Sequence, residues 1–231
     1  MKTKHVQLTL ACFVLTLELL GVSPVIGCDQ ICDDSVNTGF GYAAVDSITT
    51  GVRNTGIGWG TLTEVTTGTD NTAVGAGAQD RNIGSANTAI GSFALYGSND
   101  TLATGSNNTA VGAFAMQDDL TGDSNTAVGA FSLEANTSGA DNTGVGEDTL
   151  GLNTTGSRNV AIGSDALFLN QTGIDNTATG VNALRSNTAS YNTAYGYQTL
   201  ENNDSGNNNT AIGLDALDSN QNGSFNTATG A

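Results

Sequence analysis

The side chains that could do acid–base or nucleophilic chemistry are few and unevenly placed. The only lysines and the only histidine lie within the first five residues, so the bases beyond residue 27 are four arginines. Serine–histidine, cysteine–histidine and lysine Schiff-base catalysis therefore lack their partners there. Carboxylates are plentiful, but the sequence marks out no particular pair as the two catalytic acids of a glycosidase. We expect no enzyme, no catalytic residue, no metal site and no cofactor.

Asparagine sequons are the most numerous candidate sites. Eight occur: Asn99, Asn107, Asn136, Asn153, Asn170, Asn203, Asn208 and Asn222. Four of these share one slot in a repeated unit, at Asn136, Asn153, Asn170 and Asn203. That slot carries turn residues, so we expect exposed asparagines and a stripe of N-linked glycans in a secreted protein. The alternative is that this asparagine simply makes the turn.

Two further columns of residues recur at the repeat spacing. One holds Asp148, Asp165 and Asp215, with Asn182 between them. Stacked carboxylates repel one another and calcium would relieve this, but the Gly-Gly-x-Gly-x-Asp calcium motif is absent and solvated turns are the favoured interpretation. The other holds Phe93, Phe114 and Phe131, with Tyr42 and Trp59 in the column beside it. These rings form either a platform for sugars or an ordinary aromatic stack.

Cys28 and Cys32 are the two cysteines outside the first 27 residues. A disulfide across this short spacing fits an oxidising compartment. Two alternatives stay open: a pair of exposed thiols, or a lipidated Cys28, since Val25-Ile26-Gly27-Cys28 resembles a bacterial lipobox.

The N-terminus has the pattern of a targeting segment. A basic start precedes a mostly apolar run from Val6 to Leu20, followed by Gly21, Pro24 and small residues near position 27. We therefore divide the chain into a signal-like or strand-forming segment at 1–27, a cysteine-containing linker at 28–36 and a repeat domain at 37–231. Without the first segment, the chain has four arginines and 21 acids, and this negative charge excludes nucleic acid and anionic lipid as partners. We also expect no membrane span in the mature chain.

One phrase, Asn-Thr-Ala-Val/Ile-Gly, recurs from end to end of the repeat domain. It begins at Asn37, Asn54, Asn71, Asn87, Asn108, Asn125, Asn142, Asn159, Asn176, Asn192, Asn209 and Asn226. Eight of the eleven intervals are 17 residues, two are 16 and one is 21. Such a period matches one coil of short strands and turns, and it is too short for a useful helix. The pattern predicts an all-β fold, a parallel β-solenoid or β-roll of about eleven to twelve 17-residue coils.

Equivalent residues of stacked coils form columns. We expect the Val/Ile column (Val74, Ile90, Val111, Val128, Val145, Ile162) to fill one side of the core and a Leu column to fill the other. The Leu column comprises Leu95, Met116, Leu133, Leu150, Leu167, Leu184, Leu200 and Leu217. The asparagines should chain their amides from coil to coil, and the glycine after Val/Ile should take a positive φ at a corner.

The "NTAVG", "NTAIG" and "VAIGSDAL" stretches resemble the head repeats of trimeric autotransporter adhesins and of related phage tail-fibre and surface proteins. The resemblance implies a β-roll and assembly as a homotrimer. The unit here is longer than the common head repeat, and no coiled-coil stalk or membrane-anchoring barrel is found.

Two classes of function fit these expectations. The chain ends partway through a new coil, which favours a secreted structural protein that stacks end to end into an extracellular filament, a homopolymer. The alternative is an adhesin-type head at the cell surface that recognises glycans or receptors. Ice binding is a minor variant of the second class. It requires the threonine of each repeat to face outward, and the period-two rule places that threonine inward with the Val/Ile residue.

Overall fold

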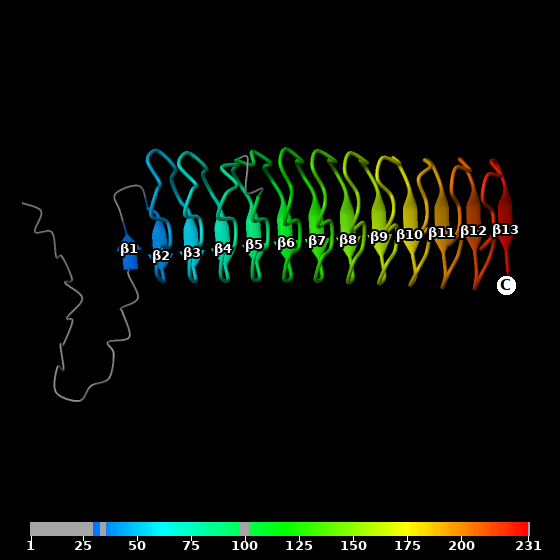
Figure 1. Ribbon diagram of the computed structural model, residues 1–231, viewed down its shortest axis with the longest axis horizontal. Helices are drawn as coiled ribbons and strands as arrows, with labels where there is room; N and C mark the ends of the chain where they lie inside the picture. Colours follow the sequence, from blue (N-terminus) through cyan, green and yellow to red (C-terminus); the bar gives the residue numbers. More distant parts are fainter. Residues whose placement is uncertain (1–29, 33–35, 98–101, 231) are drawn as a thin grey trace, which may run out of the picture.

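The computed structural model describes residues 30–32, 36–97 and 102–230, and it is a single rod of stacked coils (Figure 1). The signal-like segment 1–27 and Asn99 lie outside the described residues. Thirteen three-residue strands follow one another: β1 Gln30–Cys32, β2 Thr38–Phe40, β3 Thr55–Ile57, β4 Thr72–Val74, β5 Thr88–Ile90, β6 Thr109–Val111, β7 Thr126–Val128, β8 Thr143–Val145, β9 Val160–Ile162, β10 Thr177–Thr179, β11 Thr193–Tyr195, β12 Thr210–Ile212 and β13 Thr227–Thr229. No helix occurs among the described residues.

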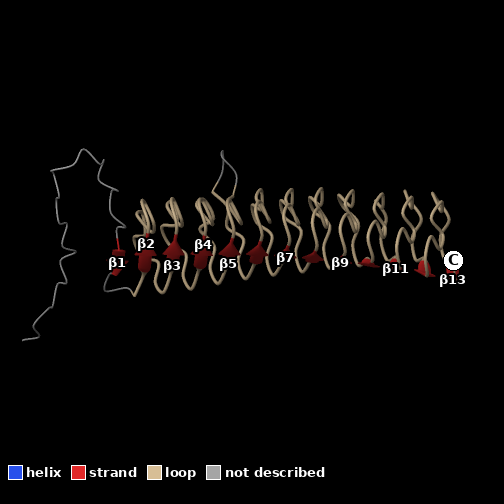
Figure 2. Ribbon diagram, turned by 90° about the horizontal axis from the view of Figure 1, so that it is seen from below, coloured by secondary structure: helices blue, strands red, loops and turns tan. Residues whose placement is uncertain are grey.

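The strands form one sheet in chain order, and the predicted parallel β-solenoid is confirmed. Strands β2 to β13 pair in parallel with equivalent repeat residues opposite one another, as Thr126 lies opposite Thr143. They make one side of the rod, and loops and turns close the rest of each coil (Figure 2). Part of the expected linker is itself a strand, because β1 pairs antiparallel with β2.

Two columns of buried amides hold neighbouring coils together. In the first asparagine ladder, Asn37 to Asn226, each Oδ1 accepts the backbone N–H of the next ladder asparagine at 2.8–3.0 Å. From Asn37 to Asn209, each Nδ2 donates to a carbonyl that closes its own coil, as Asn125 donates to the Gly139 oxygen at 2.8 Å. The predicted ladder is confirmed, and it extends to main-chain as well as side-chain groups.

The second asparagine ladder was not expected. It comprises Asn136, Asn153, Asn170, Asn187, Asn203 and Asn220. Each Nδ2 donates to the Oδ1 one coil back at 2.8–3.2 Å, and Asn136 at the start donates to Asp119 at 2.9 Å. Since a buried amide without partners is costly, these ladders fix the register of the coils.

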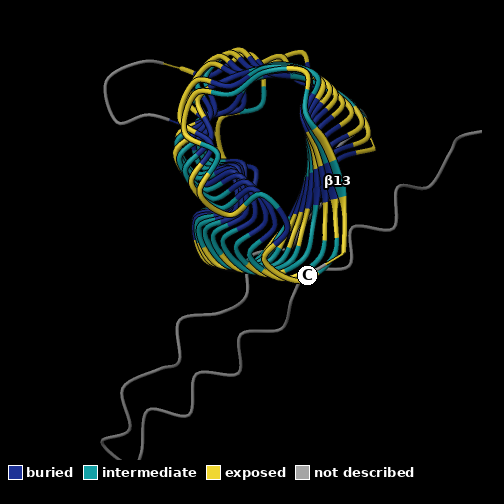
Figure 3. Cartoon of the chain, turned by 90° about the vertical axis from the view of Figure 1, so that its right-hand side faces the viewer, coloured by how far each residue is buried: buried dark blue, intermediate teal, exposed yellow. Residues whose placement is uncertain are grey.

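The expected phase of the strand is wrong. In β2 to β13 the middle residue points inward, while the first and third point outward, so the Val/Ile column lies outside the core. In these twelve strands the middle residue is alanine or glycine, because the opposite wall of the coil leaves no room for a larger side chain. A Cβ on Gly144, for example, would lie 2.6 Å from the Ser132 hydroxyl. Buried residues line the inside of the coils (Figure 3).

The Leu column is confirmed as the main apolar filling. Leu95, Met116 and Leu133 are fully buried, as are the leucines of the following coils up to Leu200, and Leu217 is partly buried. These residues have φ near +50°, which is unfavourable for a leucine. The tight turn around the core therefore imposes a backbone strain that burial of the side chain offsets.

The glycine that ends each strand has the predicted positive φ, between 121° and 143°. A Cβ on Gly129 would also lie 2.3 Å from the Gly146 carbonyl oxygen of the next coil. Conformation and close approach together explain why this position tolerates no side chain.

Candidate binding face

The outward side of the sheet is a regular surface that runs the length of the rod. We call it the sheet face and define it as the first and third residues of β2 to β13. The first residues form the threonine column, which is interrupted once, by Val160 in β9. The third residues form the apolar column: Phe40, Ile57, Val74, Ile90, Val111, Val128, Val145, Ile162, Thr179, Tyr195, Ile212 and Thr229. The strands stay aligned along the whole row (Figure 1).

Both columns are accessible to solvent. Val128 and Val145 are each 37% exposed, Ile90 is 42% exposed, and the threonines are half-buried or exposed. Within the described residues, no hydroxyl of the threonine column is hydrogen-bonded to the protein. Threonines elsewhere differ: Thr137 Oγ1 donates to the Thr154 carbonyl at 2.9 Å. The threonine column therefore offers free donors and acceptors to an external partner.

The sheet face carries no charged residue, although the chain has 22 acids and a net charge of −16. Charges lie at the corners on both sides of the strands: Glu147 follows β8, and arginines or aspartates stand at the corner before some strands. There Arg158 forms a bidentate pair with Asp175 one coil on, at 2.8 and 2.9 Å. This pair holds the pKa of the Asp175 carboxyl below its usual value. The face is thus neutral and is flanked by partly compensated corners.

The aromatic residues form an ordinary stack. Phe114 stacks on Phe93 at 5.7 Å and on Phe131 at 5.3 Å between ring centroids, with the rings nearly parallel. Tyr96 contacts Phe93 edge-on at 5.4 Å. Each internal ring face is covered by the next ring, so the stack leaves a sugar little flat surface. At the N-terminal end, Tyr42 and Trp59 remain about 60% exposed.

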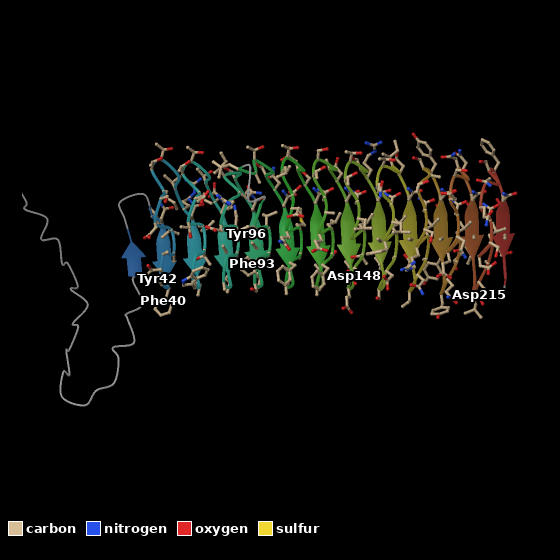
Figure 4. All side chains as sticks on the ribbon, viewed as in Figure 1. Phe40, Tyr42, Phe93, Tyr96, Asp148 and Asp215 are labelled. Carbon is tan, nitrogen blue, oxygen red and sulfur yellow. The ribbon has the colours of Figure 1, made fainter. Side chains whose placement is uncertain are left out.

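The aspartate column follows from backbone conformation. Asp148, Asp165, Asn182 and Asp215 all have φ between 52° and 58°, a region that aspartate and asparagine tolerate better than most residues. Asp148 and Asp215 lie along the same edge of the strand row as Phe40 and Tyr42 (Figure 4). Burial, then the charges of Asp165 and Glu147, raises the pKa of Asp148. Among the described residues, no group of three or more acids, cysteines or histidines is arranged to hold a metal ion.

The structure separates the candidate sequons into two classes. Asn136, Asn153, Asn170 and Asn203 are fully buried in the second asparagine ladder, so their expected exposure is wrong. Their Nδ2 atoms, which a glycan would occupy, donate hydrogen bonds inside the rod. Asn107, Asn208 and Asn222 are exposed. The recurrence of asparagine at this slot is thus explained by its structural role: its side chain is buried and hydrogen-bonds within the turn.

Asp119 is a fully buried carboxylate at the start of the second asparagine ladder. Its oxygens accept hydrogen bonds from Asn136 Nδ2 at 2.9 Å, Gly122 N at 3.1 Å and Asn108 Nδ2 at 3.2 Å. Burial nevertheless raises its pKa to about 8. Sequence reasoning missed this residue, although Asp119 stands eleven residues after Asn108, in the slot that later coils fill with asparagine.

Cys28 lies outside the described residues, and for Cys32 the backbone of β1 is described without its side chain, so the disulfide stays a prediction. The described part of the chain contains no helix that is long and apolar enough to cross a membrane. Comparisons of the chain with protein-family models, characterised proteins and solved structures give no match. The β-solenoid is compatible with a β-roll repeat protein, and function has to be inferred from the sheet face.

Proposed function

We propose that the protein is a non-catalytic recognition rod that binds a repetitive, uncharged surface through its sheet face. The observation that carries this proposal is the free threonine column beside exposed Val/Ile side chains, on a face without charge. At binding surfaces, apolar groups supply most of the contact area and a few polar groups fix the orientation of the ligand. Here the methyl groups would do the first and the threonine hydroxyls the second. Because every coil presents the same pair, a periodic ligand engages many coils at once.

The outward Val/Ile column favours a binding protein over the filament-forming protein predicted first from the sequence. An inward Val/Ile column would leave the sheet with no apolar surface to offer. With that column outward, the rod exposes a contiguous apolar strip of the kind that marks interaction sites. Placement outside the cell rests on the signal-like segment 1–27 and remains a prediction, as does glycosylation of Asn107, Asn208 and Asn222.

Cosedimentation with insoluble solids tests the proposal. The purified full chain is mixed with crystalline cellulose, with chitin and, below the freezing point, with polycrystalline ice. We expect at least one solid to retain the protein, and Val128→Lys on the sheet face to abolish retention. Ser138→Lys, on an exposed turn away from the sheet, is the matched control and should be retained like wild type. Equal retention of both variants, or retention by none of the solids, would refute the proposal.

A second candidate is the structural one, in which copies of the chain associate. The exposed residues of the apolar column, from Val128 at 37% to Tyr195 at 60%, favour it. Analytical ultracentrifugation over a concentration series distinguishes the two candidates. Monomers at all concentrations contradict self-association, whereas trimers or larger assemblies that Val128→Lys dissociates support it. End-to-end stacking into a filament predicts masses that grow with concentration without limit.

A further inference from the structure

The threonine column is more uniform than the fold requires. Eleven of the twelve strands from β2 to β13 begin with threonine, and β9 begins with valine. The exposed corner residue just before the repeat asparagine varies widely, for example Arg53, Ala86, Tyr191 and Phe225. Strand propensity alone does not explain why the first strand position is nearly always threonine. Valine, isoleucine and tyrosine are also good strand formers, and all three occur at the third position of the same strands. Uniform threonine therefore indicates a constraint from outside the protein.

The two columns make a two-dimensional lattice. Adjacent strands of a sheet lie about 4.8 Å apart, and outward residues of one strand lie about 6.7 Å apart. The rows from β4 to β9 contain only threonine, valine and isoleucine, so this central segment is free of bulky rings. The first asparagine ladder joins every pair of neighbouring coils, and the second adds further bonds from Asp119 onward. Side-chain ladders of this kind hold a many-stranded sheet flat.

We propose that the sheet face binds ice, with the regular array of methyl groups and free hydroxyls matching the ordered water of a crystal surface. This inference rests on the proposed function, in which the sheet face is the binding site. Each threonine hydroxyl hydrogen-bonds to lattice water, and the flanking methyl groups fill the gaps between water molecules without competing for them. Charged side chains, which would hold differently oriented water, are absent from the face.

The size of the sheet face favours this ligand over a protein partner. Eleven strand steps of about 4.8 Å and a width of three residues give a strip of about 50 by 10 Å. This area of about 500 Å² is smaller than the roughly 800 Å² that each partner contributes to a standard protein interface. A crystal surface needs no such minimum, because many identical weak contacts at fixed spacing add to a strong attachment.

Thermal hysteresis and ice recrystallisation of the full chain test the inference. We expect the wild type to stop the growth of ice crystals at temperatures below the melting point and to change the shape of the crystals. Thr126→Tyr and Thr143→Tyr place bulky rings in the central rows and should reduce the hysteresis by about tenfold or more, since neighbouring rows lose contact together. Tyrosine suits a strand, so the variants should keep the wild-type circular dichroism and unfolding curve. Ser138→Tyr, outside the sheet, should act like wild type.

The outcomes separate this inference from the proposed function. Absence of hysteresis and of ice retention, with cellulose or chitin still retaining wild type but not Val128→Lys, overturns ice binding alone. Absence of retention by every solid, with sheet-face variants altering only the sedimentation coefficient, overturns both and assigns the face to contacts between copies. Hysteresis that Ser138→Tyr loses as fully as Thr126→Tyr would also overturn the assignment to the sheet face.

Discussion

Replacing the buried carboxyl of Asp119 should change how the stability of the rod depends on pH. The next two coils carry asparagine at the equivalent positions, Asn136 and Asn153, so Asp119→Asn continues the second asparagine ladder toward the N-terminus. The new amide nitrogen would donate to the Gly122 carbonyl, as Asn136 donates to the Gly139 carbonyl at 3.0 Å. The substitution therefore removes a buried ionisable group and keeps the bonds that Asp119 Oδ1 accepts. It exchanges the bond that Oδ2 accepts from Asn108 Nδ2 for one donated to the Gly122 carbonyl.

The magnitude follows from the raised pKa. In the folded chain the pKa of Asp119 is about 8, against 3.8 for an ordinary aspartate. Because each tenfold difference in proton affinity is worth about 1.4 kcal/mol, ionised Asp119 lowers the free energy of unfolding by up to about 6 kcal/mol. The folded state binds the proton more tightly, so stability is highest below about pH 4. It falls as the pH rises to about 8 and is constant above that.

Urea unfolding of wild type and Asp119→Asn at pH 4, 6 and 8.5 measures this effect. We expect equal stability at pH 4 and an advantage for the variant of several kcal/mol at pH 8.5. The neighbouring Asp118→Asn is the control, because Asp118 is exposed and should change the pH dependence far less. Solenoids do not always unfold in one step, so hydrogen exchange of the Gly122 amide, which contacts Asp119, supplies a local readout.

Parallel pH profiles for wild type and Asp119→Asn between pH 4 and 8.5 would contradict a raised pKa at Asp119. Such a result would mean that the carboxyl is solvated and that the ladder does not begin where the structure places it. A loss of stability in the variant at all pH values would show that the three N–H donors need a carboxylate rather than an amide.

Three further predictions concern stability and modification. Gly129→Ala should destabilise by more than about 2 kcal/mol in urea unfolding, because its Cβ would lie 2.3 Å from a carbonyl oxygen of the next coil at a φ of 140°; wild-type stability would contradict the close approach. Asn153→Ala should cost about 2–4 kcal/mol by leaving ladder partners unpaired, whereas exposed Asn222→Ala should cost under about 0.5 kcal/mol, and equal losses would argue against the ladder. In protein secreted from eukaryotic cells, peptide mapping should find glycans at Asn107 or Asn208 and none at Asn153.

The sequence predicts the period, the parallel sheet and the inward leucines, because each repeats at fixed spacing with a recognisable residue type. Glycine after each strand and a recurring asparagine also have direct structural meanings. Residue size misled the assignment of the strand phase, since valine and isoleucine are the usual core residues. The better signal was the constancy of the middle residue: Ala127, Gly144 and their equivalents are never larger than alanine. A position limited to the smallest side chains faces a narrow interior.

The second asparagine ladder could not be predicted from a count of sequons. Asn136 and Asn153 occur in a context of Thr, Ser and Gly that is typical of exposed turns. The coil turns sharply at that point and brings a carbonyl within 3.0 Å of each amide nitrogen, which draws the side chain inward. This depends on three-dimensional closure of the coil, which the local sequence does not express.

Stability and recognition depend on the same ladders. The spacing of the threonine column is set by the stacking of the coils, and that stacking is held by amides on the inside of each coil, as between Asn125 and Asn142 at 3.2 Å. A ladder defect such as Asn142→Ala, which touches no outward side chain, should therefore disturb the lattice of the sheet face around β8. If ice or another periodic solid is the ligand, this buried substitution weakens binding while the threonines remain in place. A ligand that contacts a single coil would be insensitive to it, so the comparison of Asn142→Ala with Thr143→Tyr distinguishes recognition by periodicity from recognition by one local site.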